Sequence, residues 1–440
     1  MKKEKVIYIC ENCSYESYKW LGRCPVCGSW DSFRELKNKN LKEKEKGEVF
    51  KFTDIKLKTK KFIETGINEV DRVLGGGLVE GGLYLLGGDP GIGKTTLLLI
   101  IAEKISNKGK KVLFVSAEES GEQLKMKAER LKIEGENIWI SQSSDTESIE
   151  EEIREIKPEF LIIDSIQTVF NPLNPSSPGS VSQVRDVGSF FLKISKRENI
   201  TTFLIGHVTK TGEIAGPKTL EHMVDCVLYL EGEKRENLRI LRPFKNRFGS
   251  TDEIGIFEML EEGLLEVKDT LGLFVSELKA PGVIIFPMVE GKRVIMVQIE
   301  SLVSKTFFPV PRRESQGFDI RRLSMILTCL EKYLNLPFYQ YDVYVNVTGG
   351  IRINETAGDL PLALSIISSY KNIELPENFI SFGEIGLAGE IRNVRDYKKR
   401  IQEAKRKGFN RGIIPYIENS DKDFLSIKNL KDILRINVFS

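Results

Sequence analysis

The sequence predicts an α/β protein built from three modules, and three features of the 440-residue chain lead to this prediction. Four of its 6 cysteines lie within the first 27 residues as two Cys-x2-Cys pairs. A complete phosphate-binding loop follows one apolar run and precedes another, in the strand–loop–helix order of nucleotide-binding domains. After about residue 268 the pattern changes to short strands followed by helices, which indicates a separate α+β domain.

These changes of pattern also define the predicted boundaries, because a chain of this length exceeds one ordinary core. We expect a metal-binding module over residues 1–34, a charged linker over 35–58, a nucleotide-binding domain over 59–267 and the α+β domain over 268–440. The linker contains ELKNKNLKEKEKGE, which is almost free of apolar residues and mixed in charge, as in a flexible tether. Contact of this tether with DNA phosphates is the less favoured alternative.

The overall charge does not indicate a nucleic-acid-binding protein. Lys and Arg number 65 against 63 Asp and Glu, a net charge of +2, so a DNA site would have to be local. The N-terminus MKKEKVIYIC has no apolar segment of signal-peptide length, and no run approaches the roughly 18 apolar residues of a membrane span. We therefore expect a soluble, cytoplasmic protein with no membrane partner.

The cysteine cluster predicts a metal site. Cys10 and Cys13 form one knuckle, Cys24 and Cys27 form the other, and the ten residues between them allow all four thiolates to reach one tetrahedral ion. A module of about 30 residues buries little core, so the metal would supply much of its folding free energy.

Zinc is the favoured metal, although iron fits four thiolates as well. Two redox Cys-x2-Cys motifs are the alternative, but no thioredoxin-like βαβ pattern surrounds them. Trp20 and Trp30 are expected to cover the site. Cys226 and Cys329 stand alone in apolar periodic runs and are expected in the core.

The stretch GLYLLGGDPGIGKTTLLLIIAEKI carries the complete phosphate-binding motif. Its glycines let backbone N–H groups surround phosphate oxygens. Lys94 is expected to reach the β- and γ-phosphates, and the Thr95 hydroxyl to ligate Mg²⁺. The predicted ATP-binding residues are Gly88, Asp89, Pro90, Gly91, Ile92, Gly93, Lys94, Thr95 and Thr96.

Three further apolar runs end in polar residues, where open α/β sheets bind their ligands. Glu118 and Glu119 follow KKVLFVS, and one of them is a candidate to polarise the attacking water; alternatively both only begin the next helix. Asp164 ends EFLIID, a Walker B pattern, and is expected to hold Mg²⁺ through water. His207 ends ITTFLIGH and is either a γ-phosphate sensor or a structural histidine.

Two probable loops leave this sheet. FNPLNPSSPGSVSQ is rich in Pro, Ser and Gly, and TKTGEIAGPKTLEHMVD carries Lys210 and Lys218. Long loops in compact domains tend to be functional, and in a ring or filament ATPase these two would hold the DNA backbone. A third polar stretch, Lys245-Asn246-Arg247-Phe248-Gly249, separates two apolar strand-like runs; alone it would be a solvated hairpin turn.

The order of these motifs resembles the RecA-type ATPase core. Longer stretches resemble the bacterial RadA family of DNA-repair proteins across nearly the whole chain outside the linker. These stretches are WLGRCPVCGSW, GGDPGIGKTT, GHVTKTGEIAGPKTLEHMVD, KNRFG, PGVIIFPMVEGKR, PRRESQGFDIRRL and FGEIGLAGEIR.

The resemblance implies an ATP- and Mg²⁺-dependent DNA motor of recombinational repair, a hexameric DnaB-like ring that drives branch migration. It implies single-stranded DNA, recombination intermediates and the RecA recombinase as partners, and Glu118 rather than Glu119 as the water-activating acid. In such rings a neighbouring subunit supplies a cation to the γ-phosphate, and Lys245 and Arg247 match the motif that carries it. A DNA contact is the competing role. A filament-forming strand-pairing recombinase and a kinase or clock-type ATPase are the alternatives on the same core.

The C-terminal third resembles the proteolytic domain of Lon protease. Helices are expected over FDIRRLSMILTCLEKYLN and RDYKKRIQEAKRKGF, a strand over YDVYVNVTGG, and a helix over DLPLALSIISSY with Asp359 as its N-cap and Pro361 in its first turn. The alignment puts Ala357 at the nucleophile and Lys398 near the Lon lysine, with Thr356 adjacent. Since alanine has no hydroxyl, we expect an inactive protease fold.

The last of these helices is strongly basic. Its basic face either engages duplex DNA phosphates or is an ordinary solvated surface. The residues assigned to this face are Lys398, Lys399, Arg400, Lys405, Arg406 and Lys407.

Overall fold

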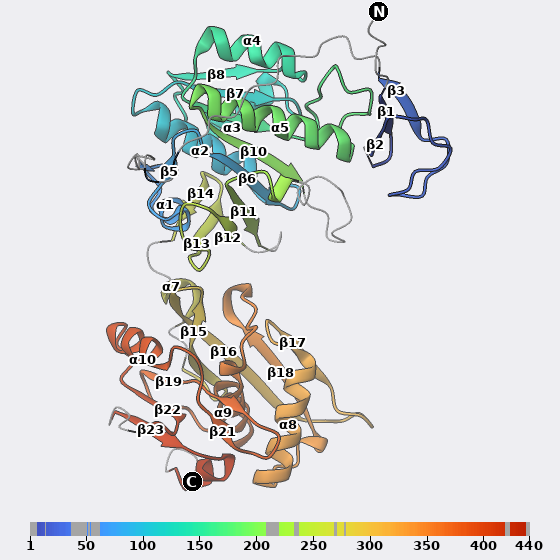
Figure 1. The fold of residues 1–440 in the computed structure, drawn as a ribbon. Helices are drawn as coiled ribbons and strands as arrows, with labels where there is room; N and C mark the ends of the chain where they lie inside the picture. Colours follow the sequence, from blue (N-terminus) through green and yellow to red (C-terminus); the bar gives the residue numbers. More distant parts are fainter. Residues whose placement is uncertain are drawn as a thin grey trace, which may run out of the picture. The chain divides into compact units, whose positions relative to one another are not determined.

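The computed structural model describes residues 7–13, 15–36, 51, 53, 62–207, 220–232, 237–267, 271–276, 279–418 and 423–436 (Figure 1). The chain divides into two compact units. The first comprises Met1–Thr251 with Gly255–Glu266, and the second comprises Asp252–Ile254 with Val267–Ser440.

The N-terminal cysteines lie on a small antiparallel sheet. Strand β1 (Ile7–Cys10) pairs with both β2 (Glu16–Ser17) and β3 (Phe33–Leu36). Cys10, Cys24 and Phe33 form its buried centre. The Trp20 and Trp30 side chains, which were predicted to cover the site, are 53% and 72% exposed.

A nine-stranded mixed sheet forms the centre of the first unit, in the order β14-β13-β12-β11-β6-β10-β9-β7-β8 (Figure 1). The strands from β11 to β8 are parallel, whereas β12, β13 and β14 are antiparallel additions. The bounds are β6 Leu83–Gly88, β7 Val112–Ser116, β8 Ile138–Ser141, β9 Phe160–Asp164, β10 Thr201–His207, β11 Cys226–Glu231, β12 Leu238–Asn246, β13 Gly255–Leu260 and β14 Gly263–Glu266.

Helices cover both faces of this sheet, which explains why its strands are continuous apolar runs rather than alternating ones. Tyr84 and Leu86 belong to a core shared with α1 and α2, while Leu83 and Leu85 belong to the core shared with α4 and α5. A short hairpin-like pair, β4 Phe62–Ile63 and β5 Leu78–Val79, flanks α1. The helices are α1 Asn68–Leu74, α2 Lys94–Ser106, α3 Gly121–Arg130, α4 Thr146–Ile156 and α5 Val181–Glu198.

The second unit contains a seven-stranded mixed sheet in the order β17-β18-β16-β15-β19-β22-β23. Helix α9 packs against β15 and β16. The strands are β15 Val283–Glu290, β16 Arg293–Lys305, β17 Arg313–Gln316, β18 Tyr341–Val347, β19 Phe379–Ser381, β22 Arg411–Pro415 and β23 Phe424–Ile427, with a separate pair of β20 Glu384–Ile385 and β21 Ile391–Arg392. The helices are α7 Leu271–Phe274, α8 Ile320–Leu334, α9 Asp359–Lys371 and α10 Tyr397–Arg406.

Two predicted details of the second unit are wrong. The N-cap of α9 is Gly358, and Asp359 is instead the first helical residue, fully buried and paired with Arg322. Arg400 does not lie on a basic face, because its side chain is 1% exposed and paired with Glu355. In both cases the charged side chain is buried by an ion pair with a residue that is distant in the sequence.

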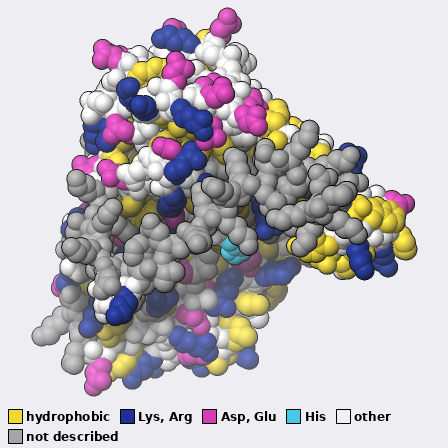
Figure 2. Space-filling view, turned by 45° about the horizontal axis from the view of Figure 1, so that its top comes forward, with side chains coloured by type: hydrophobic (Ala, Val, Ile, Leu, Met, Phe, Trp, Pro, Cys, Tyr) yellow, Lys and Arg dark blue, Asp and Glu magenta, His cyan; other side chains and the backbone are white. Residues whose placement is uncertain are grey.

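The surface agrees with the near-zero net charge. On the face shown in Figure 2, acidic and basic side chains are interspersed over the described residues. Among the helices of the described ranges, none is both long and apolar enough to span a bilayer.

Candidate functional site

The phosphate-binding loop lies where β6 meets α2. Gly88, the last residue of β6, has φ 151°, and a Cβ on it would lie 2.5 Å from the carbonyl oxygen of Leu230. Gly93, with φ 115°, is the N-cap of α2. Because glycine has no side chain, the first N–H groups of the helix are left without a capping partner from this residue. The first N–H groups of α2 therefore point into the loop, an arrangement that suits phosphate.

Lys94 begins α2 and is 4% exposed. Its ammonium donates to the carbonyl oxygens of Gly88 (2.8 Å) and Asp89 (3.0 Å), so it lies over the loop. Burial lowers the pKa of this ammonium, and the nearby Asp164 and Glu118 carboxylates oppose that effect. A buried cation at the opening of an N–H-lined loop is suited to an anion.

Thr95 and Asp164 meet although they are 69 residues apart in the chain. The Thr95 hydroxyl donates to Asp164 Oδ2 at 2.6 Å. Asp164 ends β9, and β9 and β6 both flank β10, so their carboxyl ends share one edge of the sheet. A hydroxyl and a 3%-exposed carboxylate supply the oxygen ligands that Mg²⁺ prefers.

Glu118 and Glu119 have different partners. Glu118 accepts a hydrogen bond from the Ser165 hydroxyl, and Ser165 directly follows Asp164. Glu119 accepts from the Lys127 ammonium of α3 (2.7 Å), and neither glutamate belongs to that helix, which begins after the N-cap Ser120. Only Glu118 therefore makes a described contact with the Walker B segment.

Ser165 is the residue of this site that sequence reasoning missed. Its only signal was its position after Asp164, since serine has no charge to mark it. The peptide bond between Asp164 and Ser165 is cis.

His207 ends β10, and its backbone is in register with Gly88 of β6. The position agrees with the expectation of a residue beside the phosphate-binding loop, whereas its side chain is outside what the structure describes. Lys210 and Lys218 also lie outside the described residues.

The pentad 245–249 spans the end of β12 and the following turn. Lys245 donates to the carbonyl oxygens of Glu221 (2.7 Å) and Val224 (2.8 Å), with a longer bond to that of His222 (3.3 Å). Burial lowers the pKa of Lys245, and the neighbouring Arg247 charge acts in the same direction. All three ammonium hydrogens thus have acceptors within this chain.

Of the other pentad residues, Asn246 and Phe248 contact this chain's own fold, whereas Arg247 is largely exposed. The Asn246 amide donates to Leu74 O (3.2 Å), and the Phe248 ring lies 6.0 Å from that of Tyr84. Arg247, in contrast, is 53% exposed and has one bond of 3.3 Å to Asp225. The cation that faces solvent is therefore Arg247.

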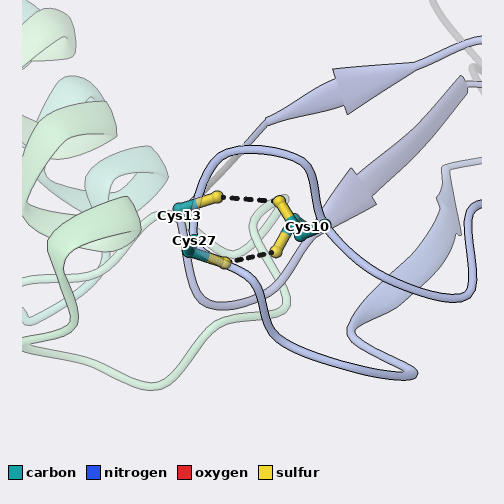
Figure 3. A group of neighbouring side chains, drawn as sticks. Cys10, Cys13 and Cys27 are labelled. Atoms are coloured by element: carbon teal, nitrogen blue, oxygen red, sulfur yellow. Dashed lines mark hydrogen bonds between the residues drawn. The ribbon is translucent and has the colours of Figure 1, made fainter.

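The four cysteines come together as predicted (Figure 3). Their Sγ atoms lie within 4.8 Å of one another, with Cys10 and Cys27 at 3.6 Å and Cys13 and Cys24 at 3.4 Å. Hydrogen bonds with the side chain and backbone of Ser29 lower the pKa of Cys27 to about 6, which favours the thiolate. Four converging sulfurs fit a tetrahedral zinc ion.

In the second unit, the position that the resemblance assigned to a nucleophile carries no usable hydroxyl. Ala357 is 1% exposed, and the hydroxyl of the adjacent Thr356 donates to Glu384 (2.7 Å). The Lys398 ammonium lies 6.0 Å from the centre of the Tyr397 ring.

The comparisons with protein families match three separate segments. Residues 8–35 match a rubredoxin metal-binding domain, 48–213 an AAA domain, and 322–418 the subunit ChlI of Mg-chelatase. Together, fold and site define a RecA-like P-loop ATPase with an N-terminal zinc ribbon and a Lon-like C-terminal domain, and they imply ATP, Mg²⁺ and Zn²⁺ as cofactors.

Relatives of nearly the same length identify the family. The chain is 42% identical to the DNA repair protein RadA of Aquifex aeolicus (99% of this chain, 100% of the relative). It is 45% identical to that of Campylobacter jejuni (94% and 95%). The chain belongs to the RadA family. A solved KaiC-like protein of Pyrococcus horikoshii is 23% identical, with a TM-score of 0.40, over 47% of this chain and 99% of that chain.

Proposed function

We propose that the protein is a DNA-dependent ATPase of recombinational repair, a hexameric DnaB-like ring that drives branch migration. It would act on single-stranded DNA and recombination intermediates, with the RecA recombinase as partner. The observation that supports this most is the convergence of Thr95, Asp164 and Glu118 beside the phosphate-binding loop, in a chain whose relatives are named for DNA repair.

The site residues divide the work of phosphoryl transfer. The N–H groups at the start of α2 bind the phosphates, and Lys94 places a positive charge on them. Thr95 and Asp164 would hold Mg²⁺, which neutralises charge on the phosphate oxygens. Glu118 would accept a proton from the attacking water, while His207 would sense the γ-phosphate.

A neighbouring subunit would complete the site, and we assign that role to Arg247 rather than Lys245. Moving Lys245 to another subunit's phosphate would break three hydrogen bonds to carbonyls, whereas moving Arg247 would break one of 3.3 Å. Lys245 instead anchors the turn at 221–224, directly after the segment that carries Lys210 and Lys218. The alternative role of either cation is contact with the DNA backbone.

ATP hydrolysis with and without single-stranded DNA tests this proposal. Lys94→Ala should abolish turnover, and Arg247→Ala should keep nucleotide binding but reduce turnover by about 10³-fold. Arg242→Ala is a matched control, because Arg242 lies on β12, five residues before Arg247, and pairs with Glu231 of its own chain. Turnover that ignores DNA and survives Arg247→Ala would refute the motor.

Mixed rings test the trans contact. Lys94→Ala subunits, inactive alone, and Arg247→Ala subunits, strongly impaired alone, should together regain hydrolysis at interfaces that pair an intact loop with an intact arginine. No recovery in verified mixed assemblies would contradict the assignment.

A strand-pairing recombinase shares the same core and is the second candidate. Electron microscopy with ATP and DNA separates the two, since closed rings favour the motor and helical filaments favour the recombinase. Ala357 aligns with the Lon nucleophile but has no hydroxyl, which disfavours a protease. We therefore expect no cleavage of unfolded protein.

A further inference from the structure

The C-terminal unit exposes apolar side chains on the loop between β16 and β17. Phe307 is 93% exposed and Val310 75%, and Tyr339, on the turn before β18, is 65% exposed. Single exposed apolar residues are ordinary, but a group of them marks a binding surface. We call residues 305–312 together with Tyr339 the aromatic loop.

Hydrogen bonds hold the two parts of the aromatic loop together. The Thr306 N–H donates to the Gln340 carbonyl oxygen (2.9 Å), and the Arg313 guanidinium donates to that of Phe338 (2.6 Å). Two prolines in the stretch FFPVPRR restrict the backbone further. The aromatic rings are therefore presented on a fixed support, so binding would cost little ordering of the backbone.

The charge of the aromatic loop has one sign. Residues 302–313 include Lys305, Arg312 and Arg313 and contain no Asp or Glu. The Arg312 guanidinium lies 3.9 Å from the centre of the Phe308 ring. The buried Asp342 faces inward, where it accepts the Arg312 N–H (2.7 Å).

We propose that the aromatic loop is a base-stacking site for single-stranded DNA. Exposed rings offer flat apolar faces to unpaired bases, and Lys305 and Arg312 lie beside them to meet the phosphates. Duplex DNA would not satisfy the rings, because its bases are already stacked. A protein partner could also use the rings, but Lys305 and Arg312, with no Asp or Glu among residues 302–313, favour a polyanion. This inference rests on the proposed function only for the choice of DNA as the nucleic acid.

Binding of the full-length protein to a fluorescent oligothymidylate tests this site. Phe307→Ala combined with Tyr339→Ala should weaken binding by about tenfold for each lost stack. Replacing the bases beneath the loop with abasic sites should weaken the wild type similarly and leave the variant unchanged. Arg312→Gln should instead lower the salt dependence of binding by about one counterion.

Tyr416→Ala is the matched control. Tyr416 is 51% exposed and has the Lys428 ammonium 4.1 Å from its ring centre, but it follows β22, near the other edge of the sheet. Equal affinities for the control and the Phe307/Tyr339 variant would overturn the proposal. The proposal would also be overturned if the Phe307/Tyr339 variant lost as much affinity for abasic strands as for normal strands.

Two further measurements separate this site from the proposed motor. Irradiation of a bromodeoxyuridine strand should crosslink a peptide that contains residues 306–312, whether or not the ATPase is stimulated by DNA. If the variant instead changes only the particle mass in sedimentation, the loop is a contact between copies and the proposal is wrong.

Discussion

Removing the Arg400 side chain should destabilise the C-terminal unit far more than removing its neighbour on α10. The guanidinium pairs with both oxygens of Glu355, donates to Pro287 O at 2.6 Å and to Arg395 O at 3.1 Å, and is 1% exposed. Loss of one partner of a buried ion pair costs about 3–5 kcal/mol. Because the Glu355 side chain is 27% exposed, water would partly replace the lost contact, and we expect about 3 kcal/mol for Arg400→Ala.

Lys399→Ala is the control for this experiment. Lys399 is 56% exposed and lies 3.4 Å from Asp396, a surface pair worth less than about 1 kcal/mol. A double variant, Glu355→Gln with Arg400→Met, keeps an acceptor for the Val289 N–H and removes both charges. It should be more stable than Arg400→Ala by more than about 1 kcal/mol, since no unpaired charge remains.

Hydrogen exchange is the suitable assay, because the chain's 3 tryptophans lie at positions 20, 30 and 139, outside this unit. Amides of β15 and α9 should exchange roughly 100-fold faster in Arg400→Ala and at nearly the wild-type rate in Lys399→Ala. Equal exchange in Arg400→Ala and Lys399→Ala would refute the reasoning. A double variant less stable than Arg400→Ala would refute it as well.

Three other outcomes follow from the first unit. Ser165→Ala should lower kcat by about tenfold with little change in KM for ATP, because it removes a donor that positions Glu118; a change confined to KM would contradict this role. Chelation of zinc, or Cys13→Ser, should unfold the cysteine module while the ATPase core keeps its circular dichroism; a protease-resistant module without metal would contradict it. Burial raises the pKa of the Asp225 carboxyl, but hydrogen bonds from Lys196 and the Leu83 N–H outweigh this effect and lower the pKa below 3.8. The ionised carboxylate therefore stabilises the fold above pH 3.8, and this contribution is lost as the pH falls through the pKa of the folded state. Asp225→Asn should therefore flatten the acid end of the stability curve measured by urea unfolding, and an unchanged acid slope would count against it.

The parts of the fold that sequence predicted well depend on local pattern. The glycine spacing of the phosphate-binding loop, the strand-end position of Asp164 and the two cysteine knuckles each follow from neighbouring residues, and the structure brings them together.

The missed features depend on pairs that are distant in sequence. Arg322 meets Asp359 and Arg400 meets Glu355, so each charge is buried by a residue that no helical or strand period connects to it. Trp30, which was expected to cover the cysteines, is 72% exposed and has the Arg23 guanidinium 5.5 Å from its ring centre.

The pentad 245–249 shows how such pairing changes a functional argument. In sequence, Lys245 and Arg247 are equivalent cations two residues apart. On a strand, side chains two residues apart share a face, so periodicity alone could not separate them. The distinction comes from their partners: Lys245 has three carbonyl acceptors, while Arg247 has one contact at 3.3 Å beyond the end of β12. A contact between subunits has to form without breaking the fold that presents it, and among these two cations Arg247 meets that condition at the lower cost in hydrogen bonds.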